Sequence, residues 1–326
     1  MNLKTRYLGF ELSNPFLVGA SPLVYDLDTV KRLEDAGAAA VVMHSLFEEQ
    51  IVRDNIRGFP HLDKSRVGIY PESRHFPLHP DAYLDHLQKL KQTVKLPIVA
   101  SLNGVHVGTW VEYAKLIQEA GADALELNLY FTPRSDSDPS SEIEKTALNI
   151  VSTVKENLSL PLAVKIAPFY TGIPRFVQRL EEAGAQAAVL FNSFFQPDID
   201  IETMTYKENF SLSEPHALLL RTRWIATLHG RVGLDLSLSG GIDSPEDAVK
   251  GLMAGATSIQ VVSCLLKKGP EYLSEFIEDF SNWMERHDFE SLDQLRGILS
   301  FAQSSNTEAM ARAGYLHMLQ AWKPDA

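Results

Sequence analysis

The sequence has a single cysteine, Cys264, among its 326 residues. One cysteine excludes an intramolecular disulfide, and it excludes a zinc or iron–sulfur site built from several cysteines of this chain. We therefore expect no metal site. No apolar run approaches the roughly 18 residues that a membrane-spanning helix requires, and residues 1–21 lack the apolar core of a signal peptide. These absences favour a soluble, cytoplasmic protein.

Basic residues are also scarce. Lys and Arg together number 30 against 42 Asp and Glu, which gives a formal net charge of −12. Such a chain has no general electrostatic attraction for nucleic acid or for anionic lipid, so we expect neither as a partner. The hydrophobic content of 45% and the charged content of 22% are typical of a globular protein.

Four segments of the chain share one pattern. Each has the last turn of an amphipathic helix, then a glycine, then a short apolar run. A glycine after a helix adopts a left-handed backbone without a Cβ clash, and a continuous apolar run is typical of a strand in a parallel sheet. The pattern therefore predicts helix-to-strand connections. The segments are 33–45, 117–128, 180–192 and 252–263, with Gly37, Gly121, Gly184 and Gly255 at their centres.

Further apolar runs raise the number of predicted strands to eight, with helical periodicity between most of them. Alternation of this kind predicts a (β/α)8 barrel, formed by residues 1–326 as a single domain. An open, doubly wound sheet is the alternative. It would usually carry a GxGxxG or GxxxxGK[ST] turn, and neither is present. The additional runs are 16–20, 96–101, 160–166 and 233–240.

Four segments fall outside this alternation. Residues 1–13 suit a short hairpin at the bottom of the barrel. Residues 46–92 and 193–215 are predicted insertions at the active-site face, where long loops are usually functional. Residues 270–326 suit the last barrel helix followed by extra helices.

The carboxyl ends of the last two predicted strands suggest a phosphate site. One strand ends in Gly240-Gly241 and the next in Ser263. Glycines let backbone N–H groups approach an anion, the serine adds a hydroxyl, and this corner is the usual phosphate site of such barrels. A tight turn without a ligand is the alternative.

Lys165 lies inside the apolar run of the fifth strand, where an unpaired charge is costly to bury. Either it contacts an anionic ligand or it pairs with Glu126 on the neighbouring strand. Asn128 and Asn192 end the flanking strands and offer amide groups suited to a heterocycle. A phosphate site, a lysine and two amides at one barrel mouth predict bound FMN, with Lys165 facing the flavin ring.

Several longer strings carry a resemblance to a known family. They are NPFLVGAS at 14–21, ELNL at 126–129, PLAVKIAP at 161–168, LFNS at 190–193, LSGGIDSPEDAVKGLMAGATSIQVVSCLL at 238–266 and WMERHDFESLDQLRG at 283–297. The sequence resembles the dihydroorotate dehydrogenases, FMN-dependent (β/α)8 enzymes of pyrimidine (UMP) biosynthesis, over nearly its whole length.

The resemblance implies roles for individual residues. Gly240, Gly241 and Ser263 would hold the FMN phosphate, and Lys165 would contact the flavin. Asn128, Asn192 and Ser193 would bind substrate, the two asparagines also contacting the cofactor. The remaining implied cofactor contacts are Ala20, Ser21, His44, Ser45, Asn103 and Val262.

The substrate side departs from the family pattern. Members usually carry Lys-Ser after the second strand, where this chain has His44-Ser45. The family's loop base, a Cys or Ser, corresponds to Phe131, which cannot take a proton, and its N-S-x-G-L string is missing from 46–92. Tyr130 and Thr132 are candidates to replace the base. His44 is either another candidate or a flavin contact in place of the lysine.

The resemblance implies oxidation of dihydroorotate to orotate, with hydride transfer to the flavin. The altered loop leaves alternatives open: an FMN oxidoreductase with another small-molecule substrate, a flavoprotein or electron-transfer subunit without turnover, or a phosphate-binding barrel without redox chemistry. Because no NAD or iron–sulfur motif is present, we expect a separate electron acceptor, either fumarate or a redox protein. The resemblance also implies a homodimer.

Overall fold

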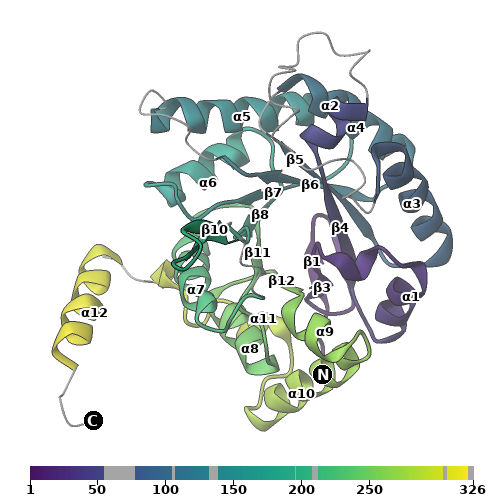
Figure 1. Cartoon of the computed structure of the whole chain (residues 1–326). Coiled ribbons are helices and arrows are strands. Elements are labelled where there is room, and N and C mark those ends of the chain that lie inside the picture. The colour runs from purple at the N-terminus through teal and green to yellow at the C-terminus, as the bar shows by residue number, and fades with distance from the viewer. Residues whose placement is uncertain are drawn as a thin grey trace.

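Eight parallel strands close into a barrel in a computed structural model that describes residues 1–54, 78–104, 107–131, 139–194, 196–207, 212–303 and 307–321 (Figure 1). The predicted (β/α)8 barrel is confirmed, and the doubly wound sheet is wrong because the last strand pairs with the first. In barrel order the strands are β3 (Phe16–Val18), β4 (Ala40–Phe47), β5 (Ile98–Gly104), β6 (Ala124–Leu129), β7 (Leu162–Ile166), β8 (Ala187–Leu190), β11 (Asp235–Ser239) and β12 (Ser258–Val261).

One long helix follows each barrel strand and covers its outer face (Figure 1). Local sequence sets the boundaries. For example, Ser244 and Asp247 form a capping box at the start of α8, and Pro245 occupies the first turn, where its missing N–H costs nothing. These helices are α1 (Leu27–Asp35), α3 (Pro80–Thr93), α4 (Val107–Glu119), α5 (Ser140–Asn157), α6 (Ile173–Glu182), α7 (Ala217–Leu228), α8 (Pro245–Ala254) and α10 (Tyr272–Arg286).

The glycines of the repeated pattern lie where the pattern predicts them. Gly37, Gly121, Gly184 and Gly255 have φ angles of 97°, 94°, 99° and 116°, and an apolar strand begins a few residues after each. The left-handed turn lets the chain leave the helix and enter the next strand directly.

A hairpin of β1 (Thr5–Tyr7) and β2 (Phe10–Leu12) closes the amino-terminal end of the barrel, as predicted. Tyr7, Leu8 and Leu12 are almost fully buried against small side chains of the strands, including Ala124 and Ala163. In the described part of the chain, the hairpin therefore covers the barrel interior at this end.

The two predicted insertions contain regular structure. Within 46–92, β4 continues to Phe47, α2 (Glu48–Asp54) follows, and α3 is the second barrel helix; residues 55–77 lie outside the described part. The 193–215 segment contains a hairpin of β9 (Asp198–Asp200) and β10 (Thr205–Lys207).

The remaining elements are short, apart from the last. They are the 3-10 helices η1 (Pro22–Val24) and η4 (Phe301–Gln303), and the helices α9 (Ser263–Lys268), α11 (Leu292–Leu295) and α12 (Thr307–Ala321). Among the described residues, no helix is long and apolar enough to cross a membrane, and no group of three or more His, Cys, Asp or Glu could hold a metal ion.

Candidate active site

Lys165 takes part in a buried polar network inside the barrel. Its Nζ donates to Gln260 Oε1 at 3.0 Å and lies 3.6 Å from Glu126 Oε1, while Gln260 Nε2 donates to Glu126 Oε2 at 2.7 Å. All three residues are at least 90% buried. Since β6 and β7 are not neighbours of β12 in the barrel, these contacts run across its interior. Lys165 therefore pairs with Glu126, as one of the two interpretations of the sequence has it, and Gln260 hydrogen-bonds to both residues.

This network still offers an unused acceptor. Glu126 Oε1 is buried without a hydrogen-bond partner among the described residues. The ammonium of Lys165 has three N–H groups, and Gln260 takes one of them. The carboxylate and Gln260 hold the Lys165 ammonium in place, and its remaining N–H groups are available to a polar ligand.

A second polar chain joins the ends of β4, β5 and β6. The hydroxyls of Ser45 and Ser101 are 2.8 Å apart, and Asn128 Nδ2 donates to Ser45 Oγ at 3.3 Å. Asn128 Oδ1 is buried without a partner in the described structure. Asn103 lies beside Asn128 in the strand register. An unsatisfied buried acceptor of this kind needs a donor, which a bound ligand can supply.

Asn192, just past β8, is 4% exposed and donates through Nδ2 to the carbonyl of Leu129 at 3.3 Å. That bond ties the ends of β6 and β8 together across β7. Its neighbour Ser193 is exposed. The two asparagines and Lys165 thus follow or occupy three consecutive strands, as the sequence suggests.

The Gly240-Gly241 turn is built so that only glycine fits. Both residues have positive φ, 94° and 79°. A Cβ on Gly241 would lie 2.5 Å from the backbone nitrogen of Leu218, so the close approach leaves no room for a side chain. The Gly241 N–H donates to Ser213 Oγ at 3.1 Å, and Ser213 Oγ lies 2.9 Å from Ser263 Oγ. One serine hydroxyl thus bridges the two parts of the predicted phosphate site.

A buried guanidinium lies directly behind this turn. Arg221 of α7 donates through Nε to the carbonyl of Ser239 and through Nη1 to that of Ala217 at 2.7 Å. A Cβ on Gly240 would be 2.9 Å from Arg221 Nη2. Burial lowers the pKa of Arg221 to about 10, so it stays charged at neutral pH. Its charge favours an anion at the turn.

His44 lies in an aromatic environment. Its ring makes edge contacts with Tyr25 and Tyr83, at 4.5 and 5.1 Å between centroids, and its Nδ1 is buried without a partner in the part of the chain described. Burial, with the nearby His86 adding to it, lowers the pKa of His44 to about 4. His44 is therefore neutral at pH 7, unlike the lysine usual at this position.

The loop after β6 carries the candidate bases. Tyr130 stacks on Phe194 at 4.7 Å, and Phe169 meets the edge of Phe194 at 4.5 Å, so three aromatic rings cluster beside the barrel mouth. Thr132 lies outside the described residues. Phe131, at the family's base position, packs against the apolar core.

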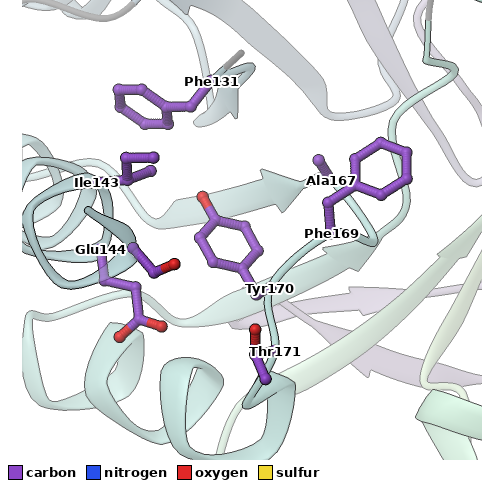
Figure 2. A pocket seen from close by; sticks show the side chains of 8 residues that line it. Phe131, Ile143, Glu144, Ala167, Phe169, Tyr170 and Thr171 are labelled. Atoms are coloured by element: carbon purple, nitrogen blue, oxygen red, sulfur yellow. The ribbon is translucent and has the colours of Figure 1, made fainter. Parts of the chain in front are cut away.

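A small cavity of about 90 Å³ lies beside this loop, between α5 and the segment after β7. Figure 2 shows the Tyr170 hydroxyl pointing toward Phe131 and Ile143, with Phe169 turned away from them. None of the residues expected to contact the cofactor lines this cavity. Phe131, at the family's base position, does line it.

The other expected contacts lie at the carboxyl ends of β3 and β12. Ser21 is buried, and its hydroxyl has no partner among the described residues. Ala20 is half-buried, and Val262 precedes the first turn of α9. Gly19 passes so close to β12 that a Cβ would lie 2.7 Å from Val262. Cys264 is fully buried, which raises the pKa of its thiol to about 11 and leaves it a packing residue.

Sequence reasoning missed three residues of this arrangement: Gln260, Arg221 and Ser213. Arg221 had a detectable signal, since it shares a helix face with the apolar residues Leu218 and Ile225. Gln260 likewise interrupts an apolar strand. Ser213 had none, because its role depends on how the 193–215 segment folds back.

Comparison with known proteins identifies the family. The family model for dihydroorotate dehydrogenase matches residues 80–284, more than half of the chain. The catalytic subunit of dihydroorotate dehydrogenase B (NAD(+)) from Thermoplasma acidophilum is 27% identical over 314 residues, covering 91% of this chain and 98% of the relative. A putative dihydroorotate dehydrogenase A (fumarate) from Aeropyrum pernix is 29% identical, covering 64% and 70%.

A relative named for a different reaction also matches. The NAD-dependent dihydropyrimidine dehydrogenase subunit PreA of Escherichia coli is 24% identical over 315 residues, covering 91% of this chain and 76% of the relative. The barrel, its polar mouth and these matches agree. The chain belongs to the dihydroorotate dehydrogenase family and is an oxidoreductase of the class that acts on CH–CH bonds.

Proposed function

We propose that this protein is an FMN-dependent oxidoreductase that oxidises dihydroorotate to orotate. The observation that carries the proposal is the Gly240-Gly241 turn, where a Cβ has no room, backed by the buried charge of Arg221. Backbone N–H groups with a cation behind them suit a phosphate. The unpartnered Asn128 Oδ1 and Ser21 Oγ suit a polar ring system above the strands.

The residues present fit FMN. Gly240, Gly241 and Ser263 would hold the phosphate, with Ser213 yielding its contacts or sharing them. Lys165, Asn128 and Asn192 would contact the ring. When bound, FMN supplies a hydride acceptor. The further contacts in this proposal are Ala20, Ser21, His44, Ser45, Asn103 and Val262.

The chain's own residues would position the substrate and handle its proton. Asn128, Asn192 and Ser193 offer amide and hydroxyl groups to a dihydropyrimidine ring. Lys165, fixed by Gln260 and Glu126, presents a positive charge to electron-rich atoms of the ligands. Tyr130 and Thr132 remain the proposed proton acceptors in the loop.

Electrons must then leave the protein. We propose a separate acceptor, either fumarate or a redox protein. The names of two relatives favour a protein, because each describes one subunit of an NAD-dependent enzyme. We further propose that the chain forms a homodimer and acts in the cytoplasm on a small molecule, without nucleic acid or membrane partners.

An anaerobic absorbance spectrum tests the proposal. The purified protein is expected to be yellow, to release FMN on denaturation, and to lose its flavin band when dihydroorotate is added. A colourless protein with no affinity for added FMN would contradict the cofactor. A yellow protein that dihydroorotate does not bleach would contradict the substrate alone.

A second candidate is an oxidoreductase with the same cofactor and a different substrate. Phe131 favours it, because loss of a general base costs roughly 10²–10⁴ in rate. The rings of Tyr130, Phe194 and Phe169 also form an apolar cluster beside the polar mouth. Titration of the flavin with neutral dihydropyrimidines, and of the reduced flavin with pyrimidines and enones, tests this candidate. If none changes the flavin spectrum, the chain is a flavoprotein without turnover of its own.

A further inference from the structure

Glu126 lies deeper in the barrel than its partner Lys165. In the strand register Lys165 is level with Asn128, near the mouth. Glu126 is level with Ala163, two residues before Lys165 on β7. The glutamate is 1% exposed and the lysine 8%. A ligand in the mouth therefore contacts the ammonium of Lys165, and the carboxylate acts on that ligand from behind.

Gln260 of β12 fixes the two charged groups relative to each other. Its amide accepts from Lys165 Nζ at 3.0 Å and donates to Glu126 Oε2 at 2.7 Å. A flipped amide would set its N–H groups against the ammonium and its oxygen against the carboxylate, so only this orientation makes both bonds. A Cβ on Gly19 would crowd the amide, at 3.1 Å from Gln260 Cβ and 3.3 Å from its Oε1. Packing as well as charge therefore holds this arrangement.

The charge of Glu126 acts over a distance inside the protein, because buried charges are screened little by salt and water. Tyr7 of the β1–β2 hairpin and Tyr83 of α3 are both almost completely buried. Burial, and after it the charge of Glu126, raises the pKa of the Tyr7 phenol. Burial also raises the pKa of Tyr83, and Glu126 adds to this rise. Groups on two separate elements thus respond to one carboxylate.

We infer that Glu126 lowers the reduction potential of the bound flavin by offsetting the charge of Lys165. The inference rests on the proposed FMN site and makes Glu126 a positioning residue that acts through Lys165. A cation beside the ring favours the negative charge that accompanies flavin reduction, and a carboxylate behind that cation opposes it. A flavin at a lower potential is a stronger electron donor, which favours transfer to the separate electron acceptor.

The size of the shift follows from distance. At an effective dielectric constant of about 20, a unit charge about 7 Å away changes an equilibrium by about 50-fold. Glu126 Oε1 lies 3.6 Å from Lys165 Nζ, and a hydrogen bond to Nζ adds roughly 3 Å, so a ligand group bound to Nζ lies within that range. Movement of Lys165 after loss of the carboxylate would reduce the effect. We therefore expect at least a tenfold change, which is about 30 mV for a two-electron couple.

Glu126→Gln tests the inference, because it removes the charge and keeps the volume of the side chain. The midpoint potential of the FMN-loaded protein is measured against a reference dye during slow reduction by xanthine and xanthine oxidase, so no dihydroorotate is required. We expect the potential to rise by at least the amount given above. Glu142→Gln is the matched control, since Glu142 has a lysine at the same 3.6 Å but is 61% exposed. This control should keep the potential of the parent protein.

Two variants of Gln260 separate charge from hydrogen bonding. Gln260→Met removes both hydrogen bonds of the amide without changing the charge of the network, so its potential should shift by less than that of Glu126→Gln. Gln260→Glu adds a carboxylate beside Lys165 and should lower the potential. The second variant tests the sign of the effect even if Glu126→Gln does not fold.

Three results would overturn the inference: a Glu126→Gln potential at or below that of the parent, an equal rise in Gln260→Met, or a Gln260→Glu potential that does not fall. A parent protein that binds no FMN contradicts the proposed cofactor and this inference together. A parent protein that binds FMN but is not bleached by dihydroorotate contradicts the proposed substrate alone, and the measured potentials still decide the inference.

Discussion

Removal of the Lys165 ammonium should destabilise the protein through the carboxylate it leaves behind. Lys165→Met would leave Glu126, which is 1% exposed, beside Gln260 and with no cation at 3.6 Å. Glu126→Gln would conversely leave Lys165 without its countercharge. The double variant removes both charges at once and keeps groups of similar volume in the barrel.

The magnitude follows from burial. Breaking a buried ion pair by removing one partner costs about 3–5 kcal/mol, because an uncompensated charge remains away from water. We therefore expect each single variant to lose about 3–5 kcal/mol of unfolding free energy. The double variant should lose much less than the sum, with a coupling energy of roughly 2–3 kcal/mol.

The chain offers a matched control. Lys145 and Glu142 have the same chemistry and the same 3.6 Å separation, but they are 72% and 61% exposed. Lys145→Met should change the unfolding free energy by less than about 1 kcal/mol.

Urea unfolding on protein stripped of flavin measures all these values without a ligand contribution. Additivity of the two buried substitutions to within about 0.5 kcal/mol would refute the reasoning. So would a Lys165→Met loss as small as that of Lys145→Met.

Three further outcomes are expected. Gly241→Ala should weaken FMN binding at least tenfold in a fluorescence titration, because its Cβ would lie 2.5 Å from a backbone nitrogen. Gly9 is the matched control, since it has a similar φ of 84° and open space around it. Gly9→Ala should lose only about 1–2 kcal/mol of stability and bind FMN normally. The pKa of His44 is lowered to about 4 in the folded protein against about 6.5 in the unfolded protein. Its contribution to stability is therefore present above pH 6.5 and is lost as the pH falls toward 4. Between pH 7 and pH 5 the parent should lose about 2 kcal/mol more unfolding free energy than His44→Leu in urea, and equal losses in the two proteins would contradict the prediction. Phe131→Cys should restore a base and raise the rate of flavin reduction by dihydroorotate by roughly 10²–10⁴ in stopped-flow traces, whereas an equal rise in Phe131→Leu would show that only space was gained.

The barrel could be predicted from the sequence because each helix–strand unit has the same local pattern. Helix, glycine and apolar strand recur with little change, and a parallel strand buried on both faces leaves a clear apolar run. The small β9–β10 hairpin left no such trace. Its strands have three residues each and expose nearly all of them, so neither alternation nor an apolar run marks them.

The candidate site could be predicted only for residues whose position along a strand is enough to put them at the barrel mouth. Lys165, Asn128 and Asn192 come at strand ends, and the barrel brings strand ends together. Gln260 reaches Lys165 across 95 residues and Glu126 across 134. Pattern along the chain carries no information on which inward side chains meet in the interior, so this partner required the structure.

The hairpin that closes the bottom of the barrel links the start of the chain to its end. The N–H of Leu8 donates to Asp235, the hydroxyl of Thr5 to the carbonyl of Thr257, and Arg296 to Thr5, across 227, 252 and 291 residues. During synthesis the hairpin leaves the ribosome long before these partners, which are made more than 200 residues later. Loop closure over such distances is slow. The β1–β2 hairpin therefore packs onto the barrel late in folding. Protection of the Leu8 amide from hydrogen exchange should mark the moment at which the barrel becomes complete.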